Sequence, residues 1–120
     1  MTKDWRPYAL FILDAIAKIG RIEVRGDIRS DEVLYDAVLR NLQTLSEAAQ
    51  HLPDGLKANH VEVPWKQISG FRNILVHSYL GEVDPEAVLR VVKEYLPTLK
   101  ATIELMLAGS ADGNAPESMT

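Results

Sequence analysis

The sequence predicts an all-α fold, an antiparallel bundle of four to five helices, and three observations support this. Apolar residues recur at helical spacings of three and four over most of the chain. Proline, glycine and aspartate residues stand where helices would begin and end. No alternation of apolar and polar residues is long enough to build a sheet. The chain has 120 residues, of which 47% are hydrophobic, and this suits the core of one domain.

The first predicted helix covers about residues 5 to 19. Its apolar face is formed by Trp5, Tyr8, Ile12, Ile16 and Ile19. Pro7 is compatible with the first turn, where its missing N–H costs little. Gly20 is predicted to end this helix, and residues 20 to 30, which include three arginines, to form an exposed loop.

The second predicted helix covers about residues 31 to 52. Ser30 or Asp31 can accept hydrogen bonds from the free N–H groups at its start. Its apolar stripe consists of Leu34, Val38, Leu42, Leu45, Ala49 and Leu52. The sequence Pro-Asp-Gly at 53–55 predicts its end, and residues 53 to 63 are predicted to form a loop.

Two further helices are predicted after this loop. The third begins at Pro64, ends near Gly81 and directs Trp65, Ile68, Phe71 and Leu75 to the core. The fourth begins with a capping Asp84, followed by Pro85 and Glu86. Its stripe consists of Val88, Val92, Tyr95, Leu99, Ile103 and Met106.

Proline and small polar residues shape the predicted end of the chain. Pro97 should kink or split the fourth helix, because it removes a backbone hydrogen bond and clashes with the preceding turn. From Gly109 onward the residues are small and polar, which predicts a disordered tail. We therefore expect a helical domain over residues 1–108 and a tail over residues 109–120.

Composition excludes several classes of function. The chain has no cysteine, so it has no disulfides, thiolate metal sites or cysteine nucleophile. No apolar run approaches the roughly 20 residues that span a bilayer, and a soluble, cytoplasmic protein is expected. The net charge of −4 argues against a broad nucleic-acid-binding surface. A role on RNA would need a local positive site, or a second subunit that completes a groove.

The three histidines have different settings. His51 lies at a helix end, where a cation interacts well with the helix dipole, and a structural role is favoured. Glu47 lies four residues before it, which without a third ligand predicts a surface pair rather than a metal site. His60 lies in a polar loop and is expected to be solvated, without a partner. His77 lies in an unusually polar segment of an apolar helix.

That segment contains Arg72, Asn73, His77 and Tyr79. Asn73 and His77 are four residues apart and would share a helix face. Arg72 and His77 would diverge by about 140° on a regular helix, but both could line a cleft between two helices. A dimer that pairs this helix with its symmetry mate would bring the groups together.

These side chains suit metal-independent RNA cleavage, in which the ribose 2′-hydroxyl of the substrate is the nucleophile. An imidazole can supply a base or acid near neutral pH. A guanidinium can stabilise the negative charge at phosphorus, and Asn73 could orient His77 or a phosphate oxygen. No metal or cofactor is implied. On spacing alone, however, a solvated Arg72 and Asn73 with a structural His77 and a core Tyr79 is the favoured interpretation.

Several segments together resemble the HepT-like toxins of the HEPN superfamily. They are GFRNILVHSYLG at 70–81, DAVLRNLQ at 36–43, EAA at 47–49 and PWKQISG at 64–70. The resemblance covers about residues 8 to 107. It implies a dimeric helical bundle that acts as an endoribonuclease toxin of a toxin–antitoxin pair.

The resemblance also implies roles for individual residues. Arg72 and His77 would be the catalytic pair of the Arg-x4-His motif, with Asn73 at the polar position after the arginine. The implied partner is a minimal nucleotidyltransferase antitoxin of the MntA type. It would neutralise the toxin by transferring AMP to Tyr79, which would block the cleft sterically and with negative charge.

Two alternatives remain at this stage. The bundle could be a non-catalytic binding module that docks a nucleotidyltransferase, which the acidic net charge favours somewhat. It could also be a purely structural helical dimer, which leaves the polar cluster unexplained.

Overall fold

The computed structural model describes residues 4–71 and 84–113, and every regular element in these ranges is an α-helix. The helices are α1 (Arg6–Arg25), α2 (Glu32–Ala49), α3 (Asp54–Ala58), α4 (Trp65–Ser69), α6 (Pro85–Glu94) and α7 (Leu96–Gly113). The prediction of an all-α bundle is confirmed. Within the described ranges, no helix is long and apolar enough to cross a membrane.

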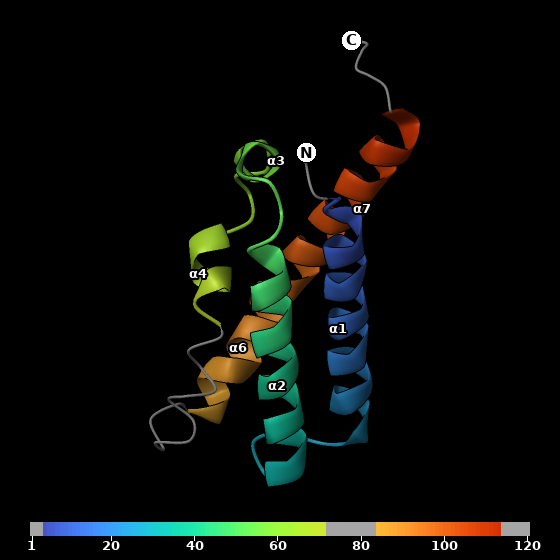
Figure 1. Ribbon diagram of the computed structural model, residues 1–120. Helices are drawn as coiled ribbons and strands as arrows, with labels where there is room; N and C mark the ends of the chain where they lie inside the picture. Colours follow the sequence, from blue (N-terminus) through green and yellow to red (C-terminus); the bar gives the residue numbers. More distant parts are fainter. Residues whose placement is uncertain (1–3, 72–83, 114–120) are drawn as a thin grey trace.

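Helices α1 and α2 form the central antiparallel pair, as Figure 1 shows. Helix α7 packs along α1, and α4 packs against α2. Helices α6 and α7 follow each other and cross behind the central pair (Figure 1). The core lies where these helices meet, because each turns an apolar stripe inward.

The predicted apolar stripes form this core. In α1, Ile12 and Ile19 are buried, while Trp5, Tyr8 and Ile16 are partly buried against them. The second stripe is buried except for Leu34, and the last is buried except for Tyr95, and both exceptions pack against the core. Ile68 of α4 and Phe71 just after it are buried, and Trp65 is partly buried.

Helix α1 is longer than predicted. It includes Gly20 and continues to Arg25, so the predicted loop is wrong over residues 20 to 25. Glycine lowers helix propensity by about 1 kcal/mol, but packing of an amphipathic face outweighs this. Ile22 continues the apolar face, and Glu23 forms an ion pair with Lys93 of α6 at 3.5 Å.

Replacing Gly20 with alanine is expected to stabilise the protein by about 0.5–1 kcal/mol. The unfolded chain is more flexible at glycine than at alanine, so glycine loses more conformational entropy when the helix forms. A Cβ at this position would meet nothing within 4 Å. Urea unfolding measures the effect. Gly26→Ala is the control, since its Cβ would lie 3.1 Å from Leu34 Cδ1, and it should show no such gain. Equal gains at both positions would contradict the local explanation.

The start of α2 follows the prediction, and its end is slightly earlier. The Asp31 side chain accepts hydrogen bonds from the backbone N–H groups of Val33 at 3.0 Å and Leu34 at 3.2 Å. Residues 50–52 form turns rather than a continuation of the helix. The predicted loop at 53–63 contains the short helix α3, which starts after Pro53.

The third predicted helix is interrupted. Helix α4 begins directly after Pro64 but ends at Ser69, and residues 70–71 form a turn. The amide of Gly70 donates to the carbonyls of both Lys66 and Gln67, which tightens the last turn. A continuous helix from Pro64 to Gly81 is therefore wrong, and its remainder lies outside the described residues.

The fourth predicted helix is split, as its proline predicts. Asp84 accepts a hydrogen bond from the Glu86 amide at 3.0 Å, and Pro85 occupies the first turn of α6. Helix α6 ends at Glu94, Tyr95 follows, and Pro97 lies in the first turn of α7. Helix α7 continues to Gly113, past the residue where the tail was expected to begin.

Candidate active site and its supports

The four predicted site residues, Arg72, Asn73, His77 and Tyr79, lie outside the described residues. Leu75 and Gly81, predicted as a core residue and a helix end, do so as well. The structure describes the elements on either side of this segment, which is hereafter called the motif segment and covers residues 72–83. These flanking elements are held by contacts with other parts of the bundle.

The residues directly before the motif segment are held in place by buried side chains. Phe71, directly before Arg72, is only 3% exposed, and Ile68 is fully buried. The Phe71 ring stacks on Tyr95 with centroids 6.1 Å apart and planes 7° apart. Since Tyr95 lies at the break between α6 and α7, the residue before Arg72 is held against that junction.

A polar network holds α4 in place from its other end. The Trp65 indole N–H donates to the backbone carbonyls of Lys57 at 3.1 Å and His60 at 3.0 Å. The Lys57 ammonium donates to the Ala49 carbonyl at 3.3 Å and lies 6.0 Å from the centroid of the Trp65 ring. Hydrogen bonds therefore connect α3 and the turn after it both to the end of α2 and to the start of α4.

His60 belongs to the same network, so the prediction of a solvated histidine without a partner is wrong. Its Nδ1 lies 3.3 Å from Glu62 Oε2, and the buried Thr102 of α7 donates its hydroxyl to the same oxygen at 3.2 Å. The backbone N–H of Glu62 itself lowers the pKa of the Glu62 carboxyl, and the contacts with His60 and Thr102 lower it further.

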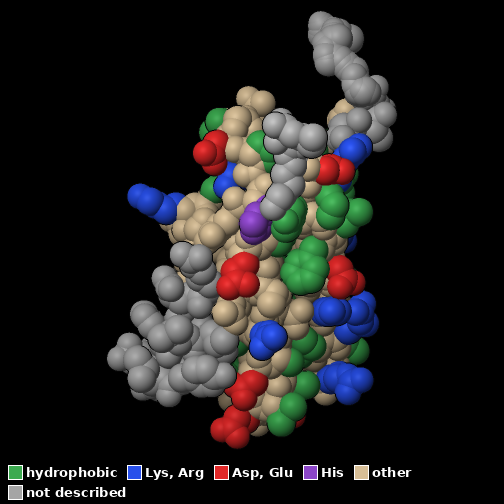
Figure 2. Space-filling view, in the orientation of Figure 1, with side chains coloured by type: hydrophobic (Ala, Val, Ile, Leu, Met, Phe, Trp, Pro, Cys, Tyr) green, Lys and Arg blue, Asp and Glu red, His purple; other side chains and the backbone are tan. Residues whose placement is uncertain are grey.

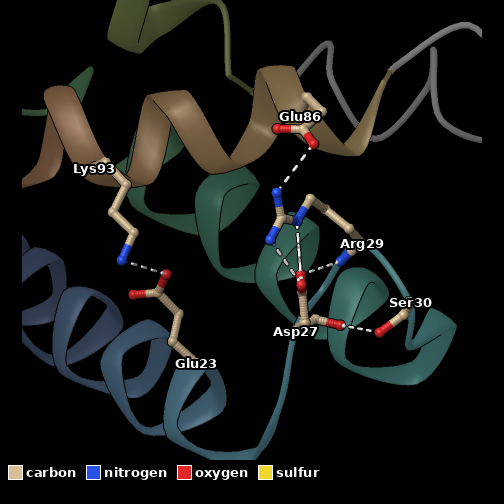
Figure 3. Close-up of polar contacts among 6 residues, drawn as sticks. All are labelled: Glu23, Asp27, Arg29, Ser30, Glu86 and Lys93. Atoms are coloured by element: carbon tan, nitrogen blue, oxygen red, sulfur yellow. Dashed lines mark hydrogen bonds and ion pairs between the residues drawn. The ribbon is translucent and has the colours of Figure 1, made fainter.

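The element after the motif segment, the start of α6, is held in place by ion pairs. Figure 3 shows the Arg29 guanidinium between two carboxylates. It donates to Asp27 Oδ2 at 2.8 Å and to Glu86 Oε2 at 3.1 Å. The hydrogen bonds from Arg29 hold the pKa of Asp27 at about 2, well below the ordinary value. Together with the Glu23–Lys93 pair (Figure 3), these contacts connect α6 to the end of α1 and to the loop after it.

His51 contacts a neighbouring helix, in agreement with a structural role. Its ring stacks on Tyr8 of α1, with centroids 4.3 Å apart and an interplanar angle of 11°. Glu47 and His51 line a shallow groove with residues of α1. Among residues 4–71 and 84–113, no three potential metal-ligating side chains gather in one place.

Three basic side chains on one face of α1 form a cluster that was not predicted. Lys18, Arg21 and Arg25 line a groove of about 420 Å³ between α1 and α2. The prediction divided them between a helix and a loop, so their shared face was not recognised. Their spacing of three and four residues is the signal that could have found them.

Comparison with known proteins identifies the family. The model of the family described as "Ribonuclease HepT-like" matches residues 12–106. This chain belongs to the HepT-like ribonuclease family. The matched range includes both Arg72 and His77, and the all-helical fold agrees with a HEPN-like bundle.

Curated relatives of HepT-like type cover most of the chain. The "Probable ribonuclease HepT" of Thermococcus cleftensis is 36% identical over 102 residues, which are 85% of this chain and 92% of the relative. The "Putative RNase TTE0752" of Caldanaerobacter subterraneus is 32% identical over 109 residues, 88% of this chain and 96% of the relative. The "Putative RNase MJ1380" of Methanocaldococcus jannaschii is 30% identical over 109 residues, with shares of 87% and 97%. No solved structure matches the chain.

Proposed function

We propose that this HepT-like protein is a metal-independent endoribonuclease whose catalytic residues are Arg72 and His77. The observation that carries the proposal is the family match, which spans 12–106 and so includes both residues. The names of the relatives, each of which describes a ribonuclease or RNase, support the same activity. The described residues on either side of Arg72 and His77 are a buried Phe71 and the capped start of α6.

The reaction needs no nucleophile from the protein. The ribose 2′-oxygen forms a bond to the adjacent phosphorus as the bond from phosphorus to the 5′-oxygen breaks. His77 takes up the 2′-hydroxyl proton, and the resulting imidazolium gives that proton to the leaving 5′-oxygen. Arg72 stabilises the negative charge that develops on the phosphoryl oxygens, and Asn73 orients His77 or one of these oxygens. The products are a 2′,3′-cyclic phosphate and a 5′-hydroxyl.

The active unit in this proposal is a homodimer with a composite site. Arg72 and His77 would lie about 140° apart around one regular helix, so a single helix does not direct both at one phosphate. A twofold axis beside this helix places the arginine of one protomer near the histidine of its partner. Such a shared cleft would attract RNA locally despite the net charge of −4, because it places two guanidinium groups around the RNA.

The biological role in this proposal is that of a toxin with a minimal nucleotidyltransferase as its antitoxin. The Tyr79 phenol oxygen attacks the α-phosphorus of ATP in the partner's active site, and pyrophosphate leaves. The tyrosine then carries AMP, whose bulk and negative charge exclude RNA phosphates from the cleft.

The test of the activity is RNA cleavage by the purified protein in the presence of EDTA, with His77→Ala as the comparison. Cleavage that persists in EDTA and leaves 2′,3′-cyclic phosphate ends supports the proposal. The alternative is a non-catalytic module that docks the nucleotidyltransferase, and the acidic net charge favours it. A protein that cleaves no RNA and is harmless when expressed alone would contradict the ribonuclease and agree with that alternative.

A further inference from the structure

The basic face of α1 consists of three side chains that border one groove. Lys18, Arg21 and Arg25 are exposed and follow one another on successive turns of the helix. Figure 2 shows Lys and Arg side chains gathered over the half of α1 that these residues occupy. The groove beside them is completed by α2, which contributes Asn41 and the apolar residues Val33, Leu34 and Ala37.

The two arginines of this face are not neutralised within the described residues. Lys18 forms an ion pair with Asp14 at 3.4 Å, whereas neither Arg21 nor Arg25 has a carboxylate partner among residues 4–71 and 84–113. Arg6 and Arg29, in contrast, pair with Asp4 at 3.0 Å and Asp27 at 2.8 Å. Arg40 and Arg90 also have no ion pair among the described residues, but neither of them lines this groove. A protein with an acidic net charge therefore keeps two available guanidinium groups together on one groove.

We infer that the groove between α1 and α2 binds the phosphate backbone of RNA, and this rests on the proposed function for its choice of RNA. Guanidinium groups match phosphate oxygens in geometry and charge. A rise of 1.5 Å per residue places Lys18 and Arg25 about 10 Å apart along the helix axis, which suits a repeating row of phosphates better than one small anion. The groove thus holds a stretch of the substrate outside the catalytic motif.

Equilibrium binding tests the inference separately from cleavage. All proteins carry His77→Ala, so that the RNA stays intact, and the probe is a fluorescently labelled, unstructured single-stranded RNA. Arg21→Gln/Arg25→Gln removes two charges from the groove while keeping good helix formers. Arg90→Gln/Lys100→Gln removes two exposed charges that likewise have no ion pair among the described residues, and it is the matched control. Fluorescence anisotropy gives the dissociation constant at several salt concentrations.

The groove variant is expected to bind RNA about tenfold or more weakly at low salt than the control does. The slope of log K against log salt should fall by roughly 1.4, because each lost phosphate contact on single-stranded RNA removes about 0.7. Equal affinities and equal slopes for the two variants would overturn the inference, as would an absence of RNA binding by the His77→Ala parent.

The outcomes also separate this inference from the proposed activity. Selective loss of binding in the groove variant, with no RNA cleavage by the wild-type protein, would support the groove and contradict the ribonuclease. Cleavage by the wild-type protein with equal binding by the two variants would support the ribonuclease and contradict the groove.

Discussion

The His77→Ala variant is expected to lose RNA cleavage by about 10²–10⁴-fold, which is the usual contribution of a general acid or base. Imidazole is the side chain that exchanges a proton near neutral pH without large perturbation, and methyl cannot replace it. Cleavage of a labelled RNA in EDTA, followed over time by gel electrophoresis, measures the rate. Circular dichroism and the unfolding temperature establish that the variant keeps its helical fold.

The other two histidines are the controls for this variant. His51 stacks on Tyr8, and His60 contacts Glu62, so both have structural partners in the described part of the chain. His51→Ala and His60→Ala should therefore cleave RNA at close to the wild-type rate. A His77→Ala protein that is folded and as active as these two variants would remove His77 from the catalytic machinery.

The Leu99→Ala variant is expected to destabilise the protein by roughly 2–5 kcal/mol, since truncation leaves a cavity as well as removing apolar contacts. Leu99 is 0% exposed in α7 and belongs to the core. In a domain of this size the unfolding temperature should fall by on the order of 10 °C. Thermal unfolding followed by circular dichroism measures the change.

Leu105→Ala in the same helix is the matched control, because Leu105 is 62% exposed. Its effect on stability should stay within about 0.5 kcal/mol. Comparable losses for the two leucines would contradict the orientation of α7, in which Leu99 faces the core and Leu105 faces away from it.

The features of the fold that depend on local sequence were predicted. Asp31 and Asp84 cap helices as expected, because a cap needs only the side chain and the next few amides. The break before Pro97 follows from the proline itself. The buried stripes follow from helical spacing, because a helix buries its apolar face whichever element packs against it.

The features that were missed depend on contacts between distant parts of the chain. Helix α1 continues through Gly20, where Ile22 packs on the core and Glu23 pairs with Lys93 of α6. His60 contacts Glu62 two residues later, and the same carboxylate oxygen accepts a hydrogen bond from Thr102, forty residues beyond Glu62. Spacing along the chain carries no information about such contacts.

The roles of the candidate site residues were predicted from the family resemblance and not from their spacing. Spacing alone favoured a solvated Arg72 and a structural His77, and the resemblance to HepT-like toxins changed that interpretation. Family membership is now established by the match over residues 12–106, while the catalytic roles of the individual residues remain predictions. The basic groove on α1 became visible only when the helix was seen to continue to Arg25.

The composite site is tested most directly by mixing two inactive proteins. Arg72→Ala and His77→Ala are purified separately with different affinity tags, and the mixed dimer is isolated through both tags. A site that takes its arginine from one protomer and its histidine from the other is intact once in each mixed dimer. We predict that the mixed dimer regains up to about half of the wild-type cleavage rate, since one of two symmetric sites is whole. A mixed dimer as inactive as its parents, or a wild-type protein that is monomeric while cleaving RNA, would contradict the account.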